Sequence, residues 1–223
     1  MTGIMGMATS RRGTVTGLAR LAGLAAMVIL LGLTGCDSLV KNLGGPPANL
    51  YTLTPKSTFA KGLPRVSWQL VVEEPIASGG LNVDRIALRS SPTELKYFAR
   101  ARWTERAPRM VQTLLVESFE NSGAIIAVGR KAIGLRSDYN LIAELREFQA
   151  EYFDAGGIPV VRVRLNAKLV KQPRRAIVAS RTFEAAVKSE GKDIRQIITA
   201  FDEALGKVLR RTEEWTLKQQ GGG

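Results

Sequence analysis

The sequence predicts an α+β fold with two layers, in which two amphipathic helices pack on one face of a mostly antiparallel sheet. Residues 194–215 place apolar side chains at helical spacing along one stripe. Residues 161–169 alternate apolar with polar or basic side chains, the pattern of a strand that is buried on one face. A second helix follows Pro108, because proline suits the first helical position.

The remaining elements follow from apolar runs and the turn residues between them. Gly79-Gly80 and Ser91-Pro92 separate three strand-like runs, and the sequence Asn-Ser-Gly at 121–123 ends the first helix. The expected order is strands over 66–72, 84–89 and 95–99, the helix from Pro108, strands over 124–128, 139–152, 161–169 and 175–183, and the helix over 194–215. The turn over 171–174 predicts that the last two strands form a hairpin.

The N-terminus predicts export and lipid attachment. Basic residues precede a charge-free apolar run over 21–33, and Leu-Thr-Gly then leads directly into Cys36, the single cysteine of the chain. The run is too short to span a bilayer, which needs about 20 apolar residues. The stretch resembles a bacterial lipobox, so we expect cleavage between Gly35 and Cys36 and lipidation of the Cys36 thiol, with palmitate among the acyl chains. The alternative is a buried free cysteine that follows an ordinary signal.

We therefore expect four segments: a lipoprotein signal peptide over 1–35, a flexible tether over 36–50, one folded domain over 51–218, and a disordered tail over 219–223. Gly44-Gly45-Pro46-Pro47 gives the tether its lack of regular structure. Lipid anchorage on the periplasmic side of the envelope follows. Asp37 slightly favours the inner membrane, although the outer membrane stays possible.

Composition excludes several classes of function. Removing the three arginines of 1–35 from 32 basic residues leaves 29 against 20 acidic ones, so the mature chain has a formal charge of +9. Export makes nucleic acid an improbable partner, whereas an anionic membrane or an acidic protein fits this charge. The chain has no histidine, and its one cysteine is assigned to lipid, which removes histidine-based catalysis, disulfides and thiolate metal sites.

No catalytic residue, metal site or cofactor is predicted, and the chain is not expected to be an enzyme. The acidic pairs Glu73-Glu74 and Glu213-Glu214 do not form an acid/base couple. Adjacent side chains point to opposite faces of a strand, and they lie about 100° apart on a helix. A carboxylate-dependent hydrolase therefore remains only a remote alternative.

Four residues are candidates for contact with a partner or a lipid headgroup: Trp103, Arg162, Arg164 and Lys168. Trp103 precedes the first helix, where an aromatic side chain more often packs on the core. The three basic residues share one strand face and could dock on anionic headgroups. The alternative for them is a solvated face on which the arginines pair with Glu144 and Glu147 of a neighbouring strand.

Several short stretches, taken in order, carry a family resemblance. They are Tyr51-Thr52-Leu53, Val83-Asp84-Arg85-Ile86-Ala87 with Tyr97, Arg102-Trp103-Thr104-Glu105, Tyr139-Asn140-Leu141 with Glu147-Phe148, and Ala200-Phe201-Asp202-Glu203-Ala204-Leu205. Together they resemble the auxiliary lipoprotein family of ABC-type transport systems, which includes the lipoproteins of Pqi and Mce-type lipid transport operons. The resemblance implies a periplasmic, non-catalytic accessory whose partners are an Mce-domain substrate-binding protein and an ABC permease and ATPase. The alternative is a structural envelope lipoprotein that stabilises a membrane assembly without binding lipid.

Overall fold

The computed structural model describes residues 47–131, 136–153 and 157–219. Its longest ladder consists of β7 (Tyr139–Glu151), β8 (Val160–Lys171) and β9 (Ala176–Lys188), each antiparallel to the next. The alternation that predicted β8 is confirmed. Its apolar side chains are fully buried at every second position: Val161, Val163, Leu165, Ala167 and Leu169.

The other edge of β7 is shared by three strands that follow one another in the chain. β2 (Val66–Val72), β3 (Ile76–Ala77) and β4 (Arg85–Ser91) all pair with β7 in parallel, each at a later stretch of it. They are parallel because the chain keeps one direction as it runs along β7. β5 (Glu94–Trp103) then turns back against β4, and β1 (Asn49–Tyr51) lies parallel to the end of β5.

The α+β class is confirmed, and the sheet is mixed: parallel pairings are added to its long antiparallel ladder. Besides the three parallel contacts of β7, β6 (Ile125–Arg130) lies parallel to β2 after the helical connection. Hydrophobic periodicity reports which face of a strand is buried and is blind to the direction of its neighbour. The two short strands β1 and β3 escaped prediction because two or three residues show no alternation.

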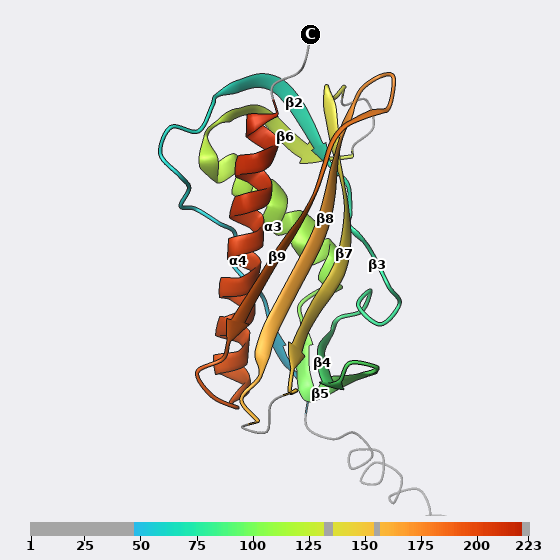
Figure 1. Cartoon of the computed structure of the whole chain (residues 1–223), viewed down its shortest axis with the longest axis vertical. Helices are drawn as coiled ribbons and strands as arrows, with labels where there is room; N and C mark the ends of the chain where they lie inside the picture. Colours follow the sequence, from blue (N-terminus) through green and yellow to red (C-terminus); the bar gives the residue numbers. More distant parts are fainter. Residues whose placement is uncertain (1–46, 132–135, 154–156, 220–223) are drawn as a thin grey trace, which may run out of the picture. The chain divides into compact units, whose positions relative to one another are not determined.

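Two helices cover one face of this sheet (Figure 1). α3 (Ala107–Ser122) carries Pro108 in its first turn and ends at Gly123, whose φ of 60° is the left-handed conformation that glycine adopts without strain. α4 (Ile194–Lys218) begins at Asp193, whose carboxylate accepts the Arg195 N–H at 2.8 Å. α4 lies along β8 and β9, and α3 packs beside it against β2 and β6.

The centre of the core is a cluster of three aromatic rings from three elements. Trp103 of β5, Phe148 of β7 and Phe201 of α4 are each at most 1% exposed, and their ring centroids are 5.1–5.5 Å apart. Such tilted and edge-to-face pairs add to the free energy of burial. The cluster joins the first half of the sheet to the C-terminal helix. No helix in the described ranges has the length and apolarity to cross a membrane.

Candidate functional site

The residues with the clearest sequence signal lie outside the described residues. Gly35 and Cys36 belong to this group, as do the signal peptide, Asp37 and most of the tether. The described chain starts at Pro47 and enters the fold at β1. Lipidation of Cys36 therefore stays a prediction of the sequence.

Trp103 lies in the core and is 1% exposed. It ends β5, four residues before α3 begins, and its ring packs against Phe148 and Phe201. Its indole Nε1 has no hydrogen-bond partner among the described residues. A side chain in this position holds the sheet to α4 and offers no surface to a partner or a lipid.

Arg162 and Arg164 lie in an ion network on the sheet face that is turned away from the helices. The Arg162 Nε is 3.0 Å from Glu151, and the Arg164 Nε is 3.2 Å from Glu147 and 3.1 Å from Glu184. Arg162 also binds Glu184. The bond to Glu151, with Glu184 adding to it, raises the pKa of the Arg162 guanidinium above its ordinary value. Three carboxylates against two guanidinium groups leave no spare positive charge at this place.

The register of the ladder explains which partners the arginines take. A bulge in β7 between Leu145 and Glu147 brings Glu147 opposite Arg164, and Glu144 then stands opposite Asn166. Glu144 binds Arg146 of its own strand at 2.8 Å. Of the two expected partners, Glu147 is in the network and Glu144 is not.

Lys168 is separate from the two arginines. It lies about 13 Å along β8 from Arg164, four residues at the usual rise per residue. It lines a hollow of about 480 Å³ near the tip of the β8–β9 hairpin, together with Lys131, Arg175 and Ile177. The structure thus divides the predicted basic face into a neutralised pair and one lysine near the hairpin tip.

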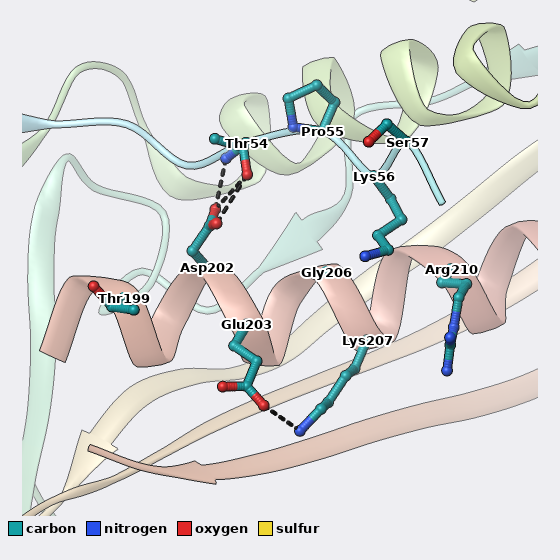
Figure 2. Close-up of a pocket in the computed structure, with 10 residues that line it drawn as sticks. All are labelled: Thr54, Pro55, Lys56, Ser57, Thr199, Asp202, Glu203, Gly206, Lys207 and Arg210. Carbon is teal, nitrogen blue, oxygen red and sulfur yellow. Dashed lines mark hydrogen bonds and ion pairs between the residues drawn. The ribbon is translucent and has the colours of Figure 1, made fainter. Parts of the chain in front are cut away.

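A second hollow, of about 470 Å³, lies between the segment that follows β1 and the outer face of α4 (Figure 2). Asp202 accepts hydrogen bonds there from the Thr54 backbone N–H at 2.7 Å and from the Thr54 hydroxyl at 2.8 Å. Glu203 binds Lys207 at 2.6 Å. Both acidic side chains of this hollow therefore bond to other residues of the chain. The hollow lies where residues 54–57 of the N-terminal segment contact α4.

The same segment is fastened at two further points. The Lys56 N–H donates to the Ser118 hydroxyl of α3 at 2.9 Å, and the Ala60 N–H donates to Glu214 of α4 at 3.0 Å. Sequence reasoning missed Asp202 and Ser118 as anchoring residues. Asp202 was visible only as part of the motif at 200–205, because a bond between residues 148 positions apart leaves no local pattern.

Glu213 of α4 is a buried carboxyl, and the sequence analysis considered it only as a member of the pair Glu213-Glu214. It is 0% exposed, and neither carboxyl oxygen has a hydrogen-bond partner among the described residues. The pKa of Glu213 is raised to about 8, chiefly by burial; the nearby Ser122 hydroxyl opposes this shift, and the charge of Glu214 contributes to it. That hydroxyl itself donates to the Phe119 carbonyl at 2.7 Å. The sequence could have indicated this burial, because Glu213 is an acidic residue on the apolar stripe of α4.

The part of the chain that the structure describes holds no cluster of three or more acidic, histidine or cysteine side chains suited to a metal ion. The acidic pairs are also separated as the sequence predicted. Glu73 accepts from Asn140 at 2.8 Å, and Glu74 binds Arg106 at 2.8 Å. These contacts are structural, and the carboxylates that make them are not arranged around a common hollow.

Comparison with known proteins places this fold. Residues 51–212 match the family described as the ABC-type transport auxiliary lipoprotein component. The crystal structure of protein XCC0632 from Xanthomonas campestris, of family DUF330, is 37% identical, with a TM-score of 0.72 over 76% of this chain and 95% of that one. The crystal structure of an uncharacterized protein has the same fold at 14% identity, with a TM-score of 0.61 over 77% of this chain and 99% of that one.

A curated relative is similar over a longer protein. An uncharacterized protein of Bradyrhizobium diazoefficiens is 28% identical over 176 residues, which is 78% of this chain and 47% of that protein. This chain thus spans about half the length of the curated relative that it matches. The matched region and the 37% identity over nearly the whole Xanthomonas chain lead to one assignment. The chain belongs to the family of ABC-type transport auxiliary lipoprotein components.

Proposed function

We propose that this protein is a lipid-anchored, non-catalytic auxiliary component of an ABC-type lipid transport system of the Mce or Pqi kind. The observation that carries the proposal is the family match over 51–212, and the stretch before Cys36, which resembles a lipobox, supports it. The lipid would hold the protein to a membrane, and the folded domain would meet the transporter. Asp37 favours the inner membrane on the periplasmic side.

The chemistry of the described domain supports a docking role over catalysis. Arg162 and Arg164 of the sheet face are neutralised by neighbouring glutamates. The acidic groups beside α4 fasten the N-terminal segment to the fold. A docking role needs a surface of fixed shape, and the hydrogen bonds of residues 54–60 to α3 and α4 hold this part of the surface in place.

The expected partners are an Mce-domain substrate-binding protein and the permease and ATPase of the transporter. Tethering raises the concentration of the domain near such membrane partners to roughly millimolar for a short flexible linker. Contacts that are weak in solution then suffice for assembly. The domain would contribute specificity, and the lipid would contribute location.

A genetic test distinguishes this proposal from a structural envelope lipoprotein. The gene would be deleted alone, together with the permease gene of the transport system, and the permease gene alone, and sensitivity to detergent would be measured. A shared pathway predicts that the double deletion is no more sensitive than either single deletion. Sensitivities that add in the double deletion would reject the transport role and favour the structural alternative.

A further inference from the structure

The outer edge of β9 is open, and its register identifies the backbone groups that face outward. β9 pairs only with β8 in the described sheet. The Ser189 N–H donates to the Pro159 carbonyl at 2.9 Å, so these two residues form a hydrogen-bonded pair. Such pairs alternate along an antiparallel ladder. From Ser180 to Lys188, odd-numbered residues of β9 therefore bond to β8, and even-numbered residues face the open edge.

A contact from α4 supports this assignment. The Arg211 Nη1 donates to the carbonyl of Glu184, an even-numbered residue, at 2.8 Å. The neighbouring outward residues Thr182 and Ala186 are exposed, and no backbone bond from them to another element is found in the described ranges. An edge with free N–H and C=O groups is a template for an added strand.

A groove runs beside this edge. It has a volume of about 630 Å³ and lies between residues 181–184 of β9 and the last turns of α4. Two aromatic side chains from its opposite walls meet there. The rings of Phe183 and Trp215 are in an edge-to-face arrangement with centroids 5.5 Å apart. The groove thus offers an apolar contact next to the open strand edge.

The groove also carries positive charge that is not compensated. Arg181, Arg211 and Lys218 line it, and none of them forms an ion pair within the described part of the chain. The two acids of the lining are already engaged. Glu184 binds Arg162 and Arg164, while Glu214 accepts the Ala60 N–H.

We propose that the edge of β9 binds an extended acidic segment of a partner protein as an added strand. Its backbone would pair with the outward N–H and C=O groups of Thr182 and Ala186 and with the N–H of Glu184, whose carbonyl already accepts Arg211. Its apolar side chains would pack on Trp215, and its carboxylates would face the three cations of the groove. A second copy of this chain fits less well, because pairing two β9 edges would bring two sets of these cations together.

The experiment uses the full-length lipoprotein in detergent micelles and a blocked peptide of about eight residues that alternates valine and glutamate, a length typical of one strand. Amide hydrogen exchange would be followed by NMR. Binding should slow exchange at Thr182, Glu184 and Ala186 and leave Arg181 and Phe183 unchanged, since these already bond to β8. The same peptide with lysine in place of glutamate should produce no such pattern.

Two matched pairs of variants separate the backbone from the charge contribution. Thr182→Pro removes an outward N–H, which an edge strand tolerates, and should weaken peptide binding about fivefold, whereas Thr182→Val keeps the N–H and should bind as wild type. Arg211→Glu should also weaken binding. Arg195→Glu makes the same change about 24 Å away along α4 and should not.

Three results would overturn the proposal. They are protection of odd and even residues alike, equal binding of the lysine peptide, and equal effects of Thr182→Pro and Thr182→Val. Slower exchange at the even residues that appears without peptide and grows with protein concentration would assign the edge to a second copy. The inference stands on β9 and α4 alone, so its failure would leave the proposed transport role untouched.

Discussion

On the proposed function, the location of the protein depends on Cys36. Only a thiol forms the thioether that carries the diacylglyceryl group, so Cys36→Ser should leave an unlipidated precursor. Labelled palmitate should enter the wild-type protein and be absent from the variant. A serine at this position changes one atom, so an equal label in both proteins would show that the lipobox interpretation is wrong.

Glu213 makes the stability of the fold depend on pH. In the unfolded chain its carboxyl ionises near the ordinary pKa of 4.5, whereas burial raises the folded-state pKa to about 8. Between these two values the folded state holds one proton more than the unfolded state. The free energy of unfolding therefore decreases as the pH rises through this window, and it receives no further contribution from Glu213 above it.

Glu213→Gln should accordingly stabilise the protein at pH 8 by on the order of 1–3 kcal/mol, because the amide cannot ionise, whereas the wild-type carboxyl ionises on unfolding. The gain should vanish near pH 4.5, where the wild-type carboxyl is also neutral. Urea unfolding across this pH range would measure it. Glu203→Gln, on the exposed side of the same helix, is the control and should show no such trend. A gain that is independent of pH would contradict the assignment.

At the scale of the elements, the sequence predicted best the strands and helices whose apolar residues recur at a regular spacing. The alternation over 161–169 and the stripe over 194–215 predicted β8 and α4, because burial of one face imposes a repeat on consecutive residues. The alignment of β2, β3 and β4 along β7 imposes no such repeat. The sequence therefore predicted the longer elements and did not reveal the parallel pairings of β7 with β2, β3 and β4.

For the candidate site residues too, the sequence predicted which residues share a strand face but not which partners they contact. Alternation placed Arg162 and Arg164 on one face, but their partners Glu151 and Glu184 depend on the register of the ladder and on the bulge before Glu147. A register cannot be read from one strand. The groove beside β9 could not be predicted either, because it lies between β9 and α4, which only the folded structure brings together.

The fastening of residues 54–60 is a contact between elements that can be tested directly. Asp202→Ala removes the acceptor of both the Thr54 N–H and the Thr54 hydroxyl, and should lower the free energy of unfolding by about 1–3 kcal/mol. It should also expose this segment to protease before global unfolding. Glu203→Ala, next to it in the same hollow, loses only an exposed pair with Lys207 and should cost less than about 0.5 kcal/mol. An equal loss of unfolding free energy in the two variants would show that the hydrogen bonds from Thr54 to Asp202 do not hold this segment in place.

For the whole molecule, anchor and domain should contribute separately. Two or three acyl chains, at about 0.8 kcal/mol per buried CH₂, make anchoring effectively stable. A secreted domain without Cys36 should restore detergent resistance poorly at native levels and partly when overproduced. Replacing Gly44-Gly45-Pro46-Pro47 by another flexible linker of equal length should have almost no effect. Full rescue by the unanchored domain at native levels would remove the anchor from the mechanism.

Purification from native membranes would show whether the anchored domain works on an ABC transporter. The full-length protein, expressed at its native level with an affinity tag, would be isolated in mild detergent and its partners and lipids identified by mass spectrometry. We expect that a permease, its ATPase and an Mce-domain protein copurify with the wild-type protein, and that they are lost from Cys36→Ser. Recovery of the protein without any transporter subunit, from membranes that contain those subunits, would contradict it.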